Sequence, residues 1–96
     1  MSRLAQAKPE RIYVKVLTAF DRTGYMSPAA ITWADGRTFW IDRVRDLRPA
    51  GTAGNGPTGD CYTVEIGGQE RKLFFERLDQ MYPSRVGRWF VEKNGA

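Results

Sequence analysis

The chain has 96 residues, of which 42% are hydrophobic and 27% charged, a composition typical of one folded domain and not of a disordered chain. It contains no histidine and a single cysteine, which excludes imidazole catalysis, histidine metal sites, intramolecular disulfides and multi-cysteine metal sites. Charges interrupt every apolar run well short of the roughly 20 residues that a membrane-spanning helix needs, and the N-terminus lacks the apolar stretch of a signal peptide. We therefore expect a cytoplasmic monomer with no membrane segment, no cofactor and no metal.

The net charge is +4, and the basic residues are 11 arginines and 4 lysines. Arginine favours bidentate contacts with phosphate or carboxylate groups. The 11 acidic residues are interspersed among the basic ones, and no basic run exceeds two residues. The charge therefore permits nucleic-acid binding, but an ordinary mixed surface explains it as well.

The N-terminal third predicts a flexible arm followed by a strand. Residues 1–10 are polar and without a lasting period, so we expect a flexible arm before a single small β-barrel domain at 11–96. Ile12, Val14 and Val16 fall on one face, and Tyr13, Lys15 and Leu17 fall on the other, a period of two that is typical of a strand over 11–20. A turn follows at 21–25.

Residues 28–43 carry the strongest local signal. Asp35-Gly36 stands between two runs of β-branched and aromatic residues, which is the signature of a two-residue type I′ hairpin. Such a turn places Trp33 opposite Thr38 and so sets the register of the whole hairpin.

The pattern changes after this hairpin. Ile41, Val44 and Leu47 are spaced by three, with charged residues between them. A period of three fits neither a regular strand nor a helix of this length. We predict a β-bulge or sharp bend near Asp42-Arg43.

Residues 49–59 contain four glycines and two prolines in 11 positions and predict a loop, which serves either for binding or as a linker. The loop lacks the Lys/Ser ending and the following helix of a phosphate-binding loop, so that function is rejected. Gly67-Gly68 predicts a second two-residue hairpin within 60–76, which places Glu65 opposite Glu70.

The C-terminal region breaks the β pattern once. Leu78, Met81 and Tyr82 have helical spacing, which predicts one or two helical turns within 76–84 that end at Pro83. Residues 88–93 predict a last strand. The elements together predict an all-β fold: a small SH3-like barrel or rolled antiparallel sheet of about six strands, with one short helical insertion.

Four blocks of sequence carry a resemblance to other proteins: Ile31-Thr32-Trp33-Ala34-Asp35-Gly36-Arg37, Ile41-Asp42-Arg43-Val44, Leu73-Phe74-Phe75-Glu76 and Arg88-Trp89-Phe90-Val91-Glu92. In these blocks the chain resembles a group of short β proteins, found mainly in Firmicutes, of which some are encoded near Y-family lesion-bypass DNA polymerases. The resemblance spans 11–93 and implies a small β fold and a DNA-repair neighbourhood. It implies no catalytic or binding residues. In that group the Phe-Glu block runs almost directly into Arg-Trp-Phe, whereas residues 77–87 intervene here.

No catalytic constellation stands out. Ser2, Ser27 and Ser84 have no histidine to activate them, and Cys61 begins an apolar strand, as a buried structural thiol does. The carboxylate pairs that could work as acid and base, Asp42 with Asp46 and Glu65 with Glu70, all have basic neighbours, which is typical of solvated charge pairs. We therefore expect a binding module and not an enzyme.

Cations interleaved with aromatic residues are the most informative feature, because proteins that bind single strands combine stacking rings with arginines. The candidate nucleic-acid-binding residues are Arg37, Trp40, Arg43, Arg45, Arg48, Arg88 and Trp89. The competing interpretation is that most of the aromatic rings form the core and only one or two remain at the surface. Trp40 is then the first choice for a surface ring, with Trp33 as its competitor. Single-stranded or duplex nucleic acid, or a nucleic-acid enzyme, is the expected partner, and the alternative is a protein partner without nucleic-acid contact.

Overall fold

The computed structural model of the chain describes residues 10–49, 59–78 and 85–93, and all the regular structure in these ranges is β. Seven strands are formed: β1 Glu10–Phe20, β2 Met26–Thr32, β3 Thr38–Trp40, β4 Arg43–Pro49, β5 Gly59–Ile66, β6 Gln69–Arg77 and β7 Gly87–Lys93. The predicted all-β class is confirmed, with one strand more than the six expected. The predicted arm at 1–10 lies outside the described residues except for Glu10, which begins β1.

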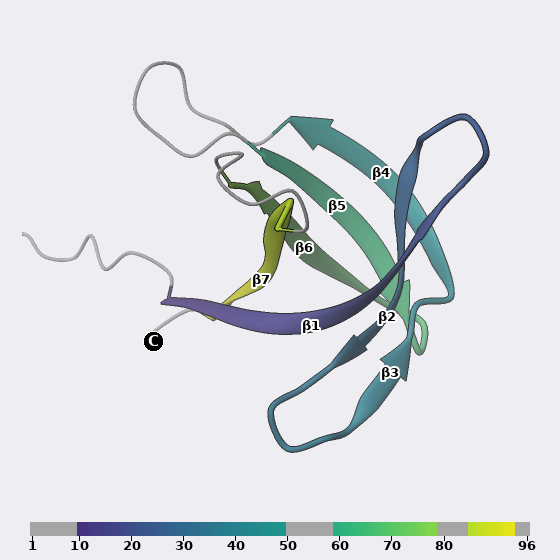
Figure 1. The fold of residues 1–96 in the computed structure, drawn as a ribbon. Helices are drawn as coiled ribbons and strands as arrows, with labels where there is room; N and C mark the ends of the chain where they lie inside the picture. Colours follow the sequence, from purple (N-terminus) through teal and green to yellow (C-terminus); the bar gives the residue numbers. More distant parts are fainter. Residues whose placement is uncertain (1–9, 50–58, 79–84, 94–96) are drawn as a thin grey trace, which may run out of the picture.

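The strands form one antiparallel sheet in the order β3-β2-β1-β7-β6-β5-β4, and the sheet is strongly curled (Figure 1). Its two edge strands, β3 and β4, are consecutive in the chain and are joined by Ile41 and Asp42 alone. The N–H of Ile41 donates to the Ala29 carbonyl at 2.9 Å, and the N–H of Asp42 donates to the Glu65 carbonyl at 2.7 Å. This short connection therefore spans from β2 to β5 and draws the two edges of the sheet together.

Strand β1 belongs to both halves of the curl. Its first half pairs with β7 and its second half with β2, and the register shifts between Leu17 and Thr18. The predicted alternation is confirmed, because Ile12, Val14 and Val16 are half-buried and their neighbours are exposed.

The first tryptophan-containing hairpin differs from its prediction. Thr32 is opposite Thr38, so Trp33 has no strand partner and the register is one residue away from that of a type I′ turn. The N–H of Gly36 donates to the Trp33 carbonyl, and the N–H of Trp33 donates to the Arg37 carbonyl, each at 2.9 Å. Gly36 has a φ of 92°, and no residue other than glycine has a positive φ in the described ranges. A type I′ turn needs two left-handed residues, whereas this three-residue loop needs one, and Gly36 supplies it.

The second hairpin is confirmed. Gly67 and Gly68 both have a positive φ, of 58° and 80°, as a type I′ turn requires. Ile66 is opposite Gln69. The predicted placement of Glu65 opposite Glu70 follows from this register and is confirmed.

The predicted irregularity after Ile41 is present in two parts. The chain leaves β3 and enters β4 across Ile41 and Asp42, which is the predicted bend. The bulge itself is further on, because the β4–β5 register shifts between Val44 and Asp46 and leaves Arg45 unpaired. The predicted bend near Asp42-Arg43 is therefore confirmed, and a bulge follows at Arg45.

The predicted helical turns over 76–84 are not formed where the structure describes this segment. Glu76 and Arg77 continue β6, paired with Arg88 and Gly87 of β7. Pairing with a neighbouring strand satisfies their backbone groups and overrides the helical spacing. Residues 79–84, and the loop residues 50–58, lie outside the described residues.

The core lies on the inner side of the curl. Leu73 and Val64 are the most deeply buried large side chains, and Ile31, Tyr62, Phe75 and Trp89 complete the central cluster. Tyr62 also donates its hydroxyl to the Met26 carbonyl at 3.1 Å, which ties β5 to the start of β2. The predicted strand at 88–93 thus contributes Trp89 to the core.

Candidate functional site

Two of the seven predicted binding residues are engaged in the fold. Trp89 is only 8% exposed, and its ring packs on those of Tyr62 and Phe75 at centroid distances of 5.2 and 4.9 Å. It is a core residue, so its ring is not available to stack on a base. Its neighbour Arg88 points to the opposite side of β7, where its guanidinium pairs with Glu76 at 2.9 Å.

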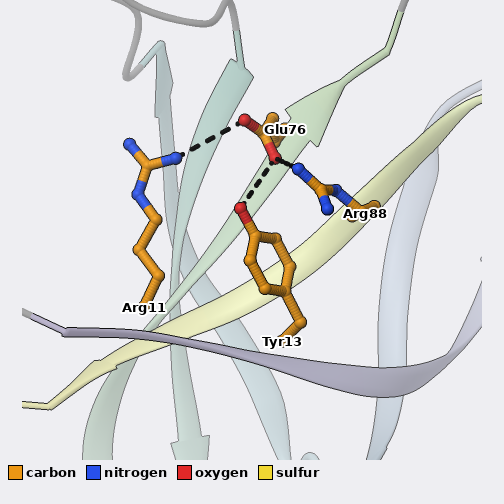
Figure 2. Close-up of polar contacts among 4 residues, drawn as sticks. All are labelled: Arg11, Tyr13, Glu76 and Arg88. Carbon is orange, nitrogen blue, oxygen red and sulfur yellow. Dashed lines mark hydrogen bonds and ion pairs between the residues drawn. The ribbon is translucent and has the colours of Figure 1, made fainter.

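Glu76 is the centre of a polar cluster that links β1, β6 and β7 (Figure 2). Its side chain is 11% exposed and accepts hydrogen bonds from Arg11 at 3.4 Å, the Tyr13 hydroxyl at 3.1 Å and Arg88 at 2.9 Å. Arg88 also lies over the Tyr13 ring, with its guanidinium carbon 4.1 Å from the centroid. Two cations are therefore balanced by one shielded carboxylate. No local sequence pattern indicates this cluster, because Arg11 and Glu76 are far apart in the chain.

The four other predicted arginines also have carboxylate partners. Arg43 is 3.0 Å from Glu65, Arg45 is 3.6 Å from Glu70 and 3.9 Å from Glu65, and each of these distances joins a guanidinium nitrogen to a carboxylate oxygen. Arg37 and Arg48 are likewise paired, with Asp35 at 2.8 Å and with Asp46 at 2.7 Å. These pairs are largely exposed, and exposed ion pairs contribute only about 0–1 kcal/mol each, so they can be exchanged for other partners. The carboxylates Glu65 and Glu70 are confirmed as parts of solvated charge pairs.

Trp40 is the surface ring that the sequence pointed to. It is 65% exposed, while its competitor Trp33 is half-buried against the core. Trp40 ends β3, directly before the bend into β4, and all seven residues of β4 are exposed. Trp40 and the β4 arginines therefore share one short stretch of chain at the edges of the sheet, whereas Arg88 and Trp89 lie elsewhere.

A different feature opens between β6 and β7. These strands pair only from Phe74 opposite Phe90 to Arg77 opposite Gly87. Residues 69–73 of β6 and 91–93 of β7 are not paired with each other, and here the two strands diverge (Figure 1). The space between residues 69–74 of β6 and 91–93 of β7 is a cleft of about 840 Å³, called here the β6–β7 cleft. Its apolar lining comes from Ile12, Ile31, Trp33, Phe39, Ile66, Phe74 and Val91. A volume of this size lies within the range of roughly 300–1,000 Å³ that is usual for ligand sites.

The charged lining of this cleft is unusual for the molecule. It consists of Glu70, Arg71, Lys72, Glu92 and Lys93. Within the described ranges no carboxylate oxygen lies within 4 Å of the charged nitrogens of Arg71, Lys72 or Lys93, in contrast to every arginine on the predicted binding list. Lys72 donates to the Thr63 hydroxyl at 2.7 Å instead. Sequence reasoning missed this site, because nothing local marks where two strands stop pairing.

The groups with catalytic potential are engaged in structure. Cys61 is half-buried, and its burial raises the pKa of the thiol, which favours the unreactive protonated form. Asp42 accepts the backbone N–H of Gly67 at 2.8 Å and so holds the second hairpin turn. Among the residues that the structure describes, no group of three metal-ligating side chains comes together, and no helix is formed that could cross a membrane.

In comparisons with known proteins, no family model, no curated protein and no solved structure matches the chain. The resemblance to short Firmicutes proteins therefore stays a prediction.

Proposed function

We propose that the protein is a non-enzymatic interaction module that receives an extended polypeptide segment in the β6–β7 cleft. The observation that carries this proposal is the early end of the β6–β7 ladder at Phe74 opposite Phe90, which leaves an apolar cleft between two strands of one sheet. A cytoplasmic location and a monomeric state, both expected from the sequence, are part of the same proposal.

The backbone of the two diverging strands favours an extended occupant. Gln69–Leu73 pair on one side with β5, and Val91–Lys93 pair on one side with β1. In an antiparallel ladder, alternate residues direct their N–H and C=O groups to opposite neighbours. Alternate residues in both stretches therefore direct these groups into the cleft, where an added strand can bond to them, as in other cases of recognition by strand addition.

The dimensions and walls of the cleft suit a short segment. Five residues of β6 extend over about 17 Å, since a strand rises about 3.3 Å per residue, so roughly five residues of a partner can lie alongside. Ile12, Ile31 and Phe39 offer apolar contacts to every second side chain of such a segment. Backbone pairing then supplies affinity, and the apolar wall supplies selectivity.

The test uses a capped hexapeptide of alternating valine and glutamine, titrated into the ¹⁵N-labelled protein. We expect amide shifts in three places only: residues 69–74, residues 91–93, and Phe39 with its neighbours on the wall of the cleft. The matched control is the same peptide with alternate amides N-methylated, which keeps the side chains and removes the donors. The absence of shifts at millimolar peptide, or equal binding of the methylated peptide, would overturn the proposal.

Nucleic-acid binding is the second candidate, and the exposure of Trp40 next to the β4 arginines favours it. A stacked base contributes about 1–3 kcal/mol, and the exposed ion pairs of Arg43, Arg45 and Arg48 can be exchanged for phosphate contacts. The DNA-repair neighbourhood that the resemblance implies is consistent with this second function.

The second candidate has its own test, in which a fluorescent single-stranded 12-mer is titrated at low and moderate salt. Trp40→Ala should weaken binding at least about fivefold, as the loss of one stacked base predicts. Leu47→Ala, at an exposed apolar position of β4, is the matched control and should have little effect. Binding that is absent at low salt, or that is the same for Trp40→Ala and the wild type, would contradict it.

A further inference from the structure

We propose that the segment received by the β6–β7 cleft carries a carboxylate side chain, and that Arg71 binds it on the inner side of the cleft. This inference rests on the function proposed above and specifies the partner: an extended polypeptide in which an acidic residue accompanies apolar ones.

Strand alternation separates the charges of the cleft by side. Arg71 shares its side of β6 with Leu73 and Phe75, both of which are buried in the core. Lys93 shares its side of β7 with Val91 and Trp89, by the same alternation. Both cations therefore lie on the inner side of the sheet, together with Ile31 and Val91 of the apolar lining.

The two acidic residues of the lining lie on the other side. Glu70 is opposite Glu65 and is engaged there by Arg45 at 3.6 Å. Glu92 alternates with Val91 and Lys93 and so projects outward. On the inner side, the described lining thus offers two cations and no carboxylate.

One acidic residue lies close to the inner side of the β6–β7 cleft but is not part of its lining. Glu10 is directly opposite Lys93 in the β1–β7 ladder. It does not line the cleft, and its carboxylate is not within 4 Å of the Lys93 ammonium. Lys93 therefore has an acidic residue across the ladder, whereas Arg71 has none, and we assign the principal role to Arg71.

The Arg71 side chain is already positioned for such a contact. Its guanidinium donates to the Gln69 side-chain oxygen at 3.0 Å, a neutral partner two residues away on the same side of β6. A guanidinium in this arrangement keeps further donors for a carboxylate, which it can bind bidentately. A partner carboxylate would add a charge-assisted bond beside an apolar surface that excludes part of the water.

The experiment compares three capped hexapeptides in which valine alternates with glutamate, glutamine or lysine, each titrated into the labelled protein at low salt. We expect the glutamate peptide to bind about tenfold more tightly than the glutamine peptide, and the lysine peptide to bind most weakly. Added salt should reduce the difference between the peptides. If none of the three binds, the cleft proposal fails; if all three bind equally, only the carboxylate preference fails.

A variant assigns the preference to its residue. Arg71→Gln should remove the advantage of the glutamate peptide while the glutamine peptide binds as before. Lys15→Gln is the matched control, because Lys15 is an exposed cation of β1 outside the cleft lining. A preference for glutamate that persists in Arg71→Gln, or that is lost equally in Lys15→Gln, would overturn the assignment.

Discussion

The two ends of the β6–β7 strand pair differ in how closely the strands approach each other. At the closed end, Phe75 and Trp89 pack at 4.9 Å on the inner side, and Phe74 stacks on Phe90 at 5.1 Å on the outer side. At the open end the same two strands separate around a cleft of about 840 Å³. Neighbouring parts of the same two strands thus differ in packing, because one end is closely packed and the other borders a cleft.

The side chains explain the difference. At the closed end Gly87 allows a close approach, because a Cβ atom there would collide with the Phe75 ring and the Glu76 carbonyl oxygen. Large apolar rings fill both sides of this end and hold the strands together. At the open end, residues 69–72 of β6 are all exposed, so they provide no comparable apolar packing between the two strands.

The largest expected effect comes from removing one phenylalanine at each end. Phe75 is 6% exposed, so Phe75→Ala should lower the free energy of unfolding by about 3–5 kcal/mol. Phe39, on the wall of the cleft, is 36% exposed, and Phe39→Ala should cost only about 1 kcal/mol while it weakens peptide binding. Urea denaturation measures both, and equal costs would mean that the open end is packed like the closed one.

A smaller effect is expected from the polar cluster at the closed end. Glu76→Gln removes the charge that two arginines share and should cost about 1–3 kcal/mol, less at high salt. Asp35→Asn removes the partner of Arg37 in an exposed pair and should leave the free energy of unfolding nearly unchanged. The same urea titrations, at two salt concentrations, report both. A Glu76→Gln protein as stable as the wild type would show that the cluster does not hold the closed end.

The smallest effect lies outside both ends, in the β1–β2 turn. Hydrogen bonds from the Thr23 hydroxyl, and then from the backbone N–H groups of Tyr25 and Thr23, lower the pKa of Asp21 in the folded protein. The resulting stabilisation is present above the ordinary pKa of aspartate and is lost as the pH falls through the lower folded value. Between about pH 5 and pH 2, the wild type should therefore lose more stability than Asp21→Ala. The free energy of unfolding of both proteins is measured across this pH range. Two curves of the same shape would contradict the prediction.

Local patterns were sufficient to predict most of the strands. The period of two in 11–20, the Gly67-Gly68 turn and the surface position of Trp40 all follow from short stretches of sequence and are confirmed. The Asp35-Gly36 turn shows the limit of such patterns. One glycine supports either a two-residue or a three-residue loop, and the pairing of Thr32 with Thr38 decides between them.

The candidate site could not be predicted in the same way, because it depends on pairing between distant strands. Whether Trp89 faces inward and Arg88 outward is set by the registers of β7 with β1 and β6. The Glu76 cluster brings together residues 65 positions apart in the chain. The β6–β7 cleft results from where a ladder between two strands ends, and its lining comes from residues that are distant in the chain.

Amide hydrogen exchange of the free protein, followed residue by residue by NMR, tests the central claim most directly. If β6 and β7 diverge as described, residues 74–77 and 87–90 should show protected amides at all positions that pair across the two strands. In 69–73 and 91–93 the alternate amides directed into the cleft should exchange rapidly, and those paired with β5 or β1 slowly. Uniform protection through 69–73 and 91–93 would mean that the two strands are paired along their whole length, and would contradict the account of the cleft.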